Sequence, residues 1–233
     1  MPTHRLTVAY DGTDFRGWAP QPGLRTVAGD LARALELDPR ELTVAGRTDT
    51  GVHAEANVVS LAAGRLLPAA ALNGRLPADI AVREAVQAAD SFDARRDARA
   101  RSYVYRLNTG PARDPLQARY ELHHTRPLDL AALDACAAAL AGTHDFTAFT
   151  PTETEHVHFD RTVLAAEWRR DGDRLEFHIT ADAFLRHMVR VLVGTMLERP
   201  DPEHLATLLD GRQRSEAGRT APAHGLTLTS VTY

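Results

Sequence analysis

The sequence predicts an α+β fold made of two related α/β domains, and three observations support this. Strand-like and helix-like segments alternate in both halves of the 233-residue chain at similar spacing. Segments 161–169 and 174–182 are joined by Arg-Asp-Gly-Asp, which predicts an antiparallel hairpin rather than a doubly wound sheet. Segment 109–127 has little periodicity and contains Gly110, Pro111, Pro115 and Pro127, which is typical of a connector between domains. We therefore expect domains at 1–110 and 111–233.

The individual elements follow from apolar periodicity and from capping residues. Alternating apolar residues predict strands in the first half at 4–10, 42–47, 57–62, 80–86 and 101–108. Thr26 suits the N-cap of a helix through Leu37, and Pro68 suits the first turn of a short helix that reaches Asn73. In the second half we expect helices at 129–141, 183–197 and 202–209, and a last strand at 226–233.

Composition excludes several classes of protein. An apolar content of 44% with 25% charged residues is ordinary for a globular protein, and no apolar run is long enough to cross a membrane. The N-terminus enters a strand-like pattern without a signal-peptide layout, and the single cysteine, Cys136, cannot form an internal disulfide. We therefore expect a cytoplasmic protein in which Cys136 is a small buried residue.

The net charge is −4, which argues against indiscriminate binding of nucleic acid but is compatible with a local basic groove. All 27 basic residues are arginine. A biased genome accounts for this most simply, although the planar guanidinium also suits recognition of phosphates and bases.

The segment 44–54 concentrates the chemistry of the first half. It places Arg47, Asp49 and His53 around two glycines, Gly46 and Gly51, which permit a sharp turn. Arg47 and Asp49 are two residues apart, so they share a face of an extended chain and can form an ion pair. A carboxylate held in this way suits a nucleophile or a stabiliser of charge. The simpler interpretation is an Asp that bonds its own turn and an Arg that pairs with it. We expect His53 to be a structural support for this turn.

The most basic segment follows at 95–106. It contains five arginines against one aspartate and leads into a strand on which Tyr103 and Tyr105 share a face. Cations beside aromatic rings are typical of nucleic-acid binding, in which they contact phosphates and stacked bases. The alternative is a solvated charged strand whose tyrosines cover the edge of a core. The arginines expected to contact RNA are Arg95, Arg96, Arg99 and Arg101.

Common cofactor motifs do not occur in the sequence. It has no phosphate loop, no dinucleotide-binding glycine motif and no nucleophile elbow. His156, His158 and Asp160 would share a face if extended, but without cysteine pairs or a helical His-Glu motif they are a weak metal site, and we expect no metal and no cofactor. An isomerisation or carboxylate-mediated glycosyl chemistry fits the remaining residues, since neither requires a cofactor.

The sequence also resembles the tRNA pseudouridine synthase A family. Segment 46–54 is similar to the active-site motif of that family, and further segments occur in family order at 10–18, 101–105, 144–149, 184–190 and 225–226. The resemblance covers nearly the whole chain. Ala19 departs from the family pattern, which usually has Gln at that place.

This resemblance implies a fold of two RRM-like or ferredoxin-like α/β domains that share a mainly antiparallel central sheet, the second domain completing the cleft. It implies a homodimer that converts uridine to pseudouridine at positions 38, 39 and 40 of the tRNA anticodon stem-loop, without a cofactor. Carried over by position, Asp49 matches the catalytic aspartate and Tyr103 the tyrosine that stacks on the target base. Arg47 matches the arginine that pairs with the aspartate and helps displace the base, and Arg190 matches a positively charged residue near the carboxylate.

Two other hypotheses assign different functions to some of the residues discussed above. A tRNA-binding protein or RNA chaperone without catalysis would use the arginines and tyrosines but give Asp49 no role. A metal-dependent hydrolase would use His156, His158 and Asp160. Within the leading hypothesis, attack of Asp49 at ribose C1′ and attack at uracil C6 are both open.

Overall fold

The computed structural model describes residues 1–154 and 156–233, and these form two compact units. The first unit contains residues 1–101 and 227–233, and the second contains residues 102–226. The expected domains, 1–110 and 111–233, differ from these units at both ends. The division falls inside two strands, β5 (Ala100–Asn108) and β10 (Leu226–Thr232), so the last residues of the chain belong to the first unit.

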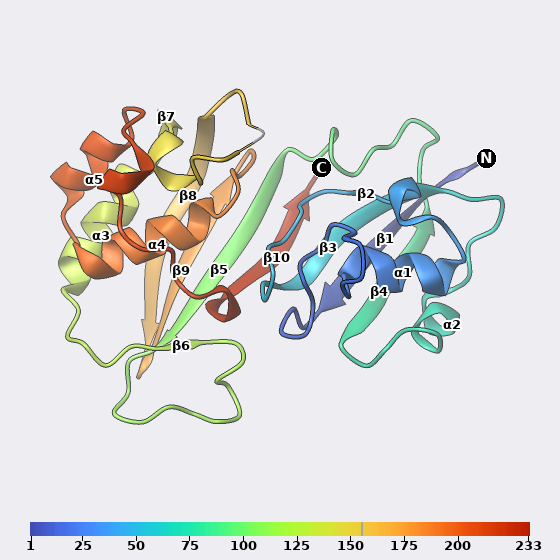
Figure 1. Cartoon of the computed structure of the whole chain (residues 1–233), viewed down its shortest axis with the longest axis horizontal. Helices are drawn as coiled ribbons and strands as arrows, with labels where there is room; N and C mark the ends of the chain where they lie inside the picture. Colours follow the sequence, from blue (N-terminus) through green and yellow to red (C-terminus); the bar gives the residue numbers. More distant parts are fainter. Residues whose placement is uncertain (155) are drawn as a thin grey trace. The chain divides into compact units, whose positions relative to one another are not determined.

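The first unit follows the β-α-β-β-α-β order of a ferredoxin-like domain (Figure 1). Its elements are β1 (Thr3–Tyr10), α1 (Val27–Leu35), β2 (Thr43–Val44), β3 (His53–Ala62), α2 (Ala69–Asn73) and β4 (Ile80–Gln87), with a 3₁₀ turn at Pro39–Glu41. The strand order is β4-β1-β3-β10, and β2 also pairs with β3. Only the pairing of β3 with β10 is parallel among the pairs described in this unit.

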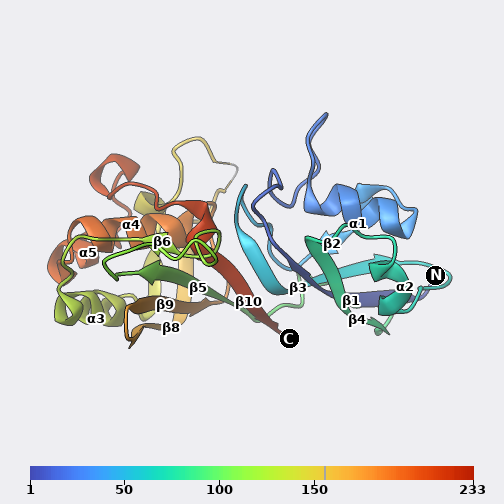
Figure 2. The same ribbon diagram turned by 90° about the horizontal axis from the view of Figure 1, so that it is seen from below.

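Helix α1 begins where the sequence predicts it. The Thr26 hydroxyl accepts a hydrogen bond from the N–H of Gly29, which satisfies one donor of the first turn. Val27 and Leu31 are fully buried, as are Leu6 and Val8 of β1, so the apolar stripe of the helix covers the sheet (Figure 2). This layer holds β1 and β3 in place. The loop at 11–25 follows β1, and the turn at Asp49 immediately precedes β3.

The second unit places helices against one group of strands. It contains most of β5, then β6 (Leu122–His123), α3 (Leu130–Ala139), β7 (Gly142–Asp145), β8 (Asp160–Asp171), β9 (Arg174–Ala181), α4 (Met188–Glu198) and α5 (Pro202–Leu208), with 3₁₀ turns at Thr147–Phe149, Arg214–Glu216 and Ala223–Gly225. The strand order is β5-β9-β8-β7, with β6 parallel to β5. Helices α4 and α5 lie on one side of these strands (Figure 2). The β8–β9 hairpin and the mainly antiparallel pairing confirm the predicted α+β class.

One sequence expectation needs adjustment in this unit. The helix expected from residue 183 begins at Met188, because Asp182 accepts hydrogen bonds from Ala183 and from Thr162 on β8 and so holds the chain out of a helix. His187 then turns into α4 with a left-handed φ of 63°. Residues 145–149 contain the end of β7 and the 3₁₀ turn Thr147–Phe149.

Cys136 is fully buried on α3, as expected, and burial raises the pKa of its thiol to about 11. Such a thiol is unreactive at neutral pH. Among the described residues, no helix combines the length and apolar character needed to cross a membrane.

Candidate active-site loop and RNA-facing residues

Asp49 lies in a tight turn between β2 and β3. The N–H of Val52 donates to the carbonyl of Asp49 at 3.1 Å, and Gly51 adopts a φ of 79°, which confirms the predicted role of this glycine. The Asp49 side chain is half-buried, whereas Arg47 and Thr50 are exposed. The turn therefore presents a carboxylate and an arginine within three residues.

Buried side chains fix the backbone on both sides of Arg47. The Asn57 amide donates to the carbonyl of Gly46 at 2.8 Å and to the hydroxyl of Tyr10 at 3.1 Å. The Tyr10 hydroxyl lies 2.8 Å from the hydroxyl of Thr48. Burial raises the pKa of Tyr10 to about 12, partly offset by its bonds to Thr48 and Asn57, so Tyr10 is protonated at neutral pH.

The loop after β1 packs directly on the Asp49 turn. The N–H of Trp18 donates to the carbonyl of Thr48 at 3.0 Å. Gly17 has a φ of 85°, and a Cβ there would lie 2.9 Å from the same carbonyl oxygen. A Cβ on Gly12 would lie 2.0 Å from the carbonyl oxygen of Val52, so no other residue fits without moving the backbone. These two glycines allow one loop to support the other.

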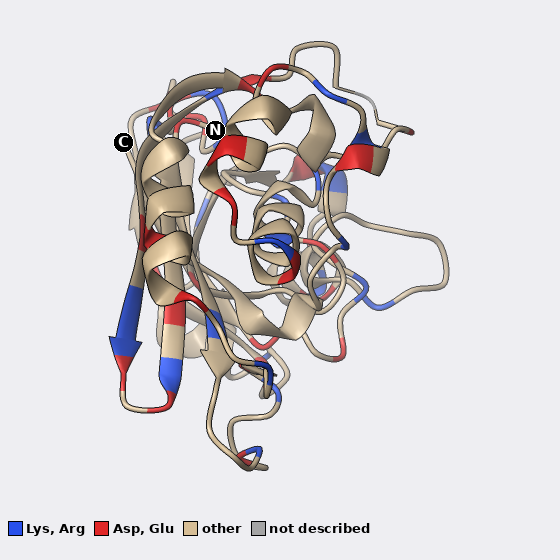
Figure 3. Cartoon of the chain, turned by 90° about the vertical axis from the view of Figure 1, so that its left-hand side faces the viewer, with Lys and Arg blue, Asp and Glu red and all other residues tan. Residues whose placement is uncertain are grey.

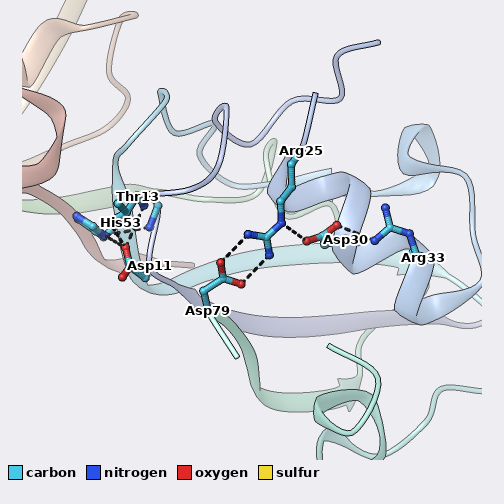
Figure 4. A network of polar contacts seen from close by, with 8 residues as sticks. Asp11, Thr13, Arg25, Asp30, Arg33, His53 and Asp79 are labelled. Carbon is cyan, nitrogen blue, oxygen red and sulfur yellow. Dashed lines mark hydrogen bonds and ion pairs between the residues drawn. The ribbon is translucent and has the colours of Figure 1, made fainter. Parts of the chain in front are cut away.

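His53 and Asp11 complete this support. The N–H of Gly12 donates to Nδ1 of His53 at 3.0 Å, and Oδ1 of Asp11 lies 3.1 Å from the same nitrogen (Figure 4). The N–H and hydroxyl of Thr13 donate to that carboxylate. His53 is buried and holds the turn at 11–13, whereas the sequence suggested that it supports the 44–54 turn.

Arg25 closes the other end of the loop. Its two terminal nitrogens donate to the Asp79 carboxylate at 2.7 and 2.8 Å, and its Nε donates to Asp30 on α1 at 2.9 Å (Figure 4). The guanidinium carbon lies 4.2 Å from the centre of the buried Phe15 ring. Asp79 also accepts the N–H of Asp11 through its carbonyl, so one residue fixes both ends of the loop.

Arg47 does not form the ion pair with Asp49 that the sequence suggested. In the described part of the chain Arg47 is exposed and no ion pair joins it to Asp49. The anchors at Gly46 and Thr48 set the course of the backbone, and the Arg47 side chain extends into solvent. The arginine is thus available to a bound ligand.

Tyr103 and Arg190 belong to the second unit. Tyr103 lies on β5, largely buried, with its ring edge-to-face with Phe184 at a centroid distance of 5.0 Å and an angle of 82°. Arg190 lies on α4, and its Nε donates to the carbonyl of Ala221 at 2.8 Å. Gly194 makes this possible, because a Cβ there would lie 1.7 Å from the Arg219 carbonyl and would push the 219–221 loop away.

The charge of Arg190 acts on nearby groups of the same unit. Burial lowers the pKa of His224 and the positive charge of Arg190 lowers it further, which keeps this imidazole neutral. Burial raises the pKa of Tyr105, and Arg190 opposes the rise.

The four arginines expected to contact RNA differ in their surroundings. Arg95 and Arg99 are exposed. Arg96 is exposed but forms an ion pair with Asp97 at 2.8 Å. Arg101 is buried, and its guanidinium donates to the carbonyls of Ala45, Arg95 and Ala98. This placement supports a structural role for Arg101, and we do not include it among the RNA contacts proposed below.

The weak metal site is not assembled. No group of three His, Cys, Asp or Glu side chains within the described ranges 1–154 and 156–233 is arranged to hold a metal ion. His158 and Asp160 instead use their carbonyls to accept hydrogen bonds from Arg161.

Sequence reasoning assigned no role to the Tyr10 hydroxyl, Thr48 or Asn57. The available signal was a polar residue, Asn57, at the start of an otherwise apolar predicted strand, because a buried amide requires partners. Its partners lie 11 and 47 residues away, so the pattern alone does not identify them.

One family model and several curated proteins are similar to this chain. Residues 136–233 match the family model described as tRNA pseudouridine synthase. Over its full length the chain is similar to curated proteins named tRNA pseudouridine synthase A. The protein of Moorella thermoacetica is 42% identical over 246 residues, with 100% of both chains covered. That of Halalkalibacterium halodurans is 41% identical, covering 95% of this chain and 89% of its own. That of Bacillus subtilis is 38% identical, covering 98% of each.

Among solved structures, a chain of a Cbf5-Nop10-Gar1 complex aligns with 97% of this chain and 48% of its own, at 13% identity and a TM-score of 0.41. That likeness is too distant to add to the assignment.

Proposed function

The chain belongs to the tRNA pseudouridine synthase family, and from this premise we propose that it isomerises uridine to pseudouridine at positions 38, 39 and 40 of the tRNA anticodon stem-loop, with Asp49 as the nucleophile. The observation that carries the proposal is the turn at Asp49. Its backbone is fixed by buried partners on both sides, while Asp49 itself is half-buried and Arg47 is exposed. Fixed backbone beneath a presented carboxylate is what a positioned nucleophile requires.

The reaction balances without a cofactor. The bond from ribose C1′ to uracil N1 breaks, the base turns, and C1′ bonds to C5. The proton on C5 is lost and N1 gains one, so substrate and product are isomers. The Asp49 carboxylate forms a temporary covalent bond, at C1′ or at C6 of the uracil, and is released when the new carbon–carbon bond is complete.

Three other side chains have separate tasks in this proposal. Tyr103 provides a flat surface on which the target base stacks, and its edge-to-face contact with Phe184 fixes the ring plane. Arg47 helps displace the base from the stem, which otherwise costs roughly a few kcal/mol in lost pairing and stacking. Arg190, whose Nε donates to the Ala221 carbonyl, matches by position the positively charged residue that the family resemblance implies for substrate binding.

Arg95, Arg96 and Arg99 are the proposed phosphate contacts, because all three are exposed. We also propose that the protein acts as a homodimer in the cytoplasm, as the family resemblance implies.

Asp49→Asn tests the assignment of the nucleophile. The purified variant should bind tRNA within about threefold of wild type, because the amide keeps the shape of the side chain, and should form no pseudouridine. Pseudouridine is mapped by reverse transcription after carbodiimide treatment of the tRNA. Asp90→Asn, an exposed acid of the same unit, is the matched control and should retain full activity.

Two results would contradict the proposal in different ways. Pseudouridine formed by Asp49→Asn would show that another residue is the nucleophile. A wild-type protein that binds tRNA but modifies no uridine would support the alternative of a non-catalytic RNA-binding protein.

A further inference from the structure

Three buried side chains beneath the Asp49 turn form one connected hydrogen-bond group, Tyr10, Thr48 and Asn57. Asn57 is fully buried, Tyr10 is 4% exposed and Thr48 is 7% exposed. Their exposure is too low for water to replace a lost partner easily. If one of these hydrogen bonds is lost, the backbone that the group holds must therefore move.

The direction of the bonds follows from the backbone groups. The N–H of Val58 donates to Oδ1 of Asn57 at 3.0 Å, and Nδ2 of Asn57 donates to the Gly46 carbonyl. These two contacts fix the orientation of the amide, because a flipped amide would face a donor with a donor. The second proton of Nδ2 is then directed at the Tyr10 oxygen. The hydroxyls of Tyr10 and Thr48 lie 2.8 Å apart and share a hydrogen bond in which either oxygen can be the donor.

The group fixes the chain on both sides of Arg47. It holds Gly46 through its carbonyl and Thr48 through its side chain, and the N–H of Trp18 holds Thr48 a second time through its carbonyl. Asp49 follows Thr48 directly. The Tyr10 ring is itself placed by Phe15 and Trp18, with centroid distances of 6.5 and 6.1 Å.

We propose that Tyr10, Thr48 and Asn57 are positioning residues for Asp49, which act by setting the course of the backbone that presents the carboxylate and which do not touch the substrate. This inference rests on the proposed function. A nucleophile displaced by about 1 Å can lose on the order of a hundredfold in rate, so a hydroxyl that only orients the backbone affects turnover without contributing to binding.

Tyr10→Phe is the first test, and Tyr233→Phe is its matched control. Both substitutions remove one hydroxyl from a tyrosine of the same unit, and the Tyr233 hydroxyl donates to the Ala94 carbonyl at 2.8 Å, in a contact that does not include the turn. We expect both variants to melt at somewhat lower temperature. Tyr10→Phe should lower the single-turnover rate at least about tenfold, with the tRNA dissociation constant within about threefold of wild type. Tyr233→Phe should keep the wild-type rate.

Thr48 provides a second test that does not depend on Tyr10. Thr48→Val keeps the shape of the side chain but removes the hydroxyl, and it should lower the rate about as much as Tyr10→Phe. Thr48→Ser keeps the hydroxyl and should restore most of the rate. The two hydroxyls share one hydrogen bond, so removing both should cost little more than removing one. The single-turnover rate of the combined variant Tyr10→Phe with Thr48→Val should therefore lie within about threefold of the rate of either single variant.

The outcomes separate this inference from the proposed function. If wild type forms pseudouridine, Asp49→Asn does not, and Tyr10→Phe and Thr48→Val both keep the wild-type rate, the positioning role is wrong while the proposed function stands. Equal rate losses in Tyr10→Phe and Tyr233→Phe would also overturn it, since the effect would then be one of general stability. A wild-type protein that forms no pseudouridine would remove both proposals.

Discussion

Arg47 illustrates how one residue can be exposed while its neighbours are fixed. The carbonyl of Gly46 and the hydroxyl of Thr48 are held by buried partners, whereas the Arg47 side chain is in solvent. Its contribution to folding should therefore be small. Its contribution to a bound complex can be large, because a guanidinium at a fixed position binds phosphate and base edges with little further ordering.

We expect Arg47→Ala to change the free energy of unfolding by less than about 0.5 kcal/mol, as for other exposed positions, and to lower kcat/KM at least about tenfold. Urea titration and single-turnover assays measure the two effects. Arg40→Ala is the control, because Arg40 is also exposed and pairs with Asp38, the N-cap of the 3₁₀ turn. A large loss of stability in Arg47→Ala, or an unchanged kcat/KM, would contradict this prediction.

At this scale the sequence predicted the turn better than its contacts. Two glycines around Asp49 indicate a sharp turn, and Gly51 has the left-handed φ that this requires. Among the residues that the structure describes, Arg47 is exposed and the expected pair with Asp49 does not form. Spacing along the chain describes which side chains could meet, but it does not reveal the distant partners, Tyr10 and Asn57, whose hydrogen bonds hold the backbone of the turn.

In strand β5, too, the local sequence did not predict contacts with residues distant along the chain. Its first arginine, Arg101, was expected to contact RNA because it begins a basic strand. It is instead buried, and three carbonyls of Ala45, Arg95 and Ala98 accept its hydrogen bonds. The charge pattern of a strand does not reveal which guanidinium turns inward.

Arg101→Met should lower the free energy of unfolding by about 2–4 kcal/mol, because the long apolar side chain fills the site but leaves those carbonyls without a donor. Arg99→Met, an exposed neighbour, should change it by less than about 0.5 kcal/mol. Urea unfolding at constant slope measures both. Equal stability of the two variants would show that Arg101 is not structural.

Elements with strong local signals were predicted well. The β8–β9 hairpin follows from the Asp-Gly turn, and α3 follows from Asp129, whose carboxylate caps Ala132, and from Gly142 at its end. The start of α4 was placed too early, since the bond of Asp182 to Thr162 on β8 depends on a neighbouring strand.

For the whole molecule, the unit boundaries could not be read from composition. Gly and Pro at 109–127 suggested a linker, yet the units divide at residues 101 and 226. The reason is a long-range pairing, in which Thr227 and Leu228 of β10 align with His53 and Ala54 of β3. A strand that returns to an earlier unit leaves no local signal at the point where it crosses.

Net charge is likewise a poor guide to where RNA binds. Many arginines are paired with acids, and on the side of the second unit seen in Figure 3 acidic and basic residues lie close together. In the described part of the chain, no ion pair links Arg95 or Arg99 to an acidic side chain. These two arginines can therefore bind phosphate without first giving up a partner.

This difference predicts how tRNA affinity depends on salt. Each phosphate contact releases counterions and adds about 0.7–0.9 to the slope of log K against log salt concentration, so wild type should bind steeply more weakly as salt is raised. The double variant Arg95→Ala with Arg99→Ala should reduce that slope by about 1.5, whereas Arg96→Ala should reduce it less, because Asp97 already neutralises Arg96. Filter binding at about 50 to 300 mM salt measures these slopes. Arg40→Ala is the control and should keep the wild-type slope. If the double variant kept the wild-type slope, phosphate would be bound by other residues. An acidic partner could not explain such a result, because no ion pair in the described part of the chain joins Arg95 or Arg99 to an acidic side chain.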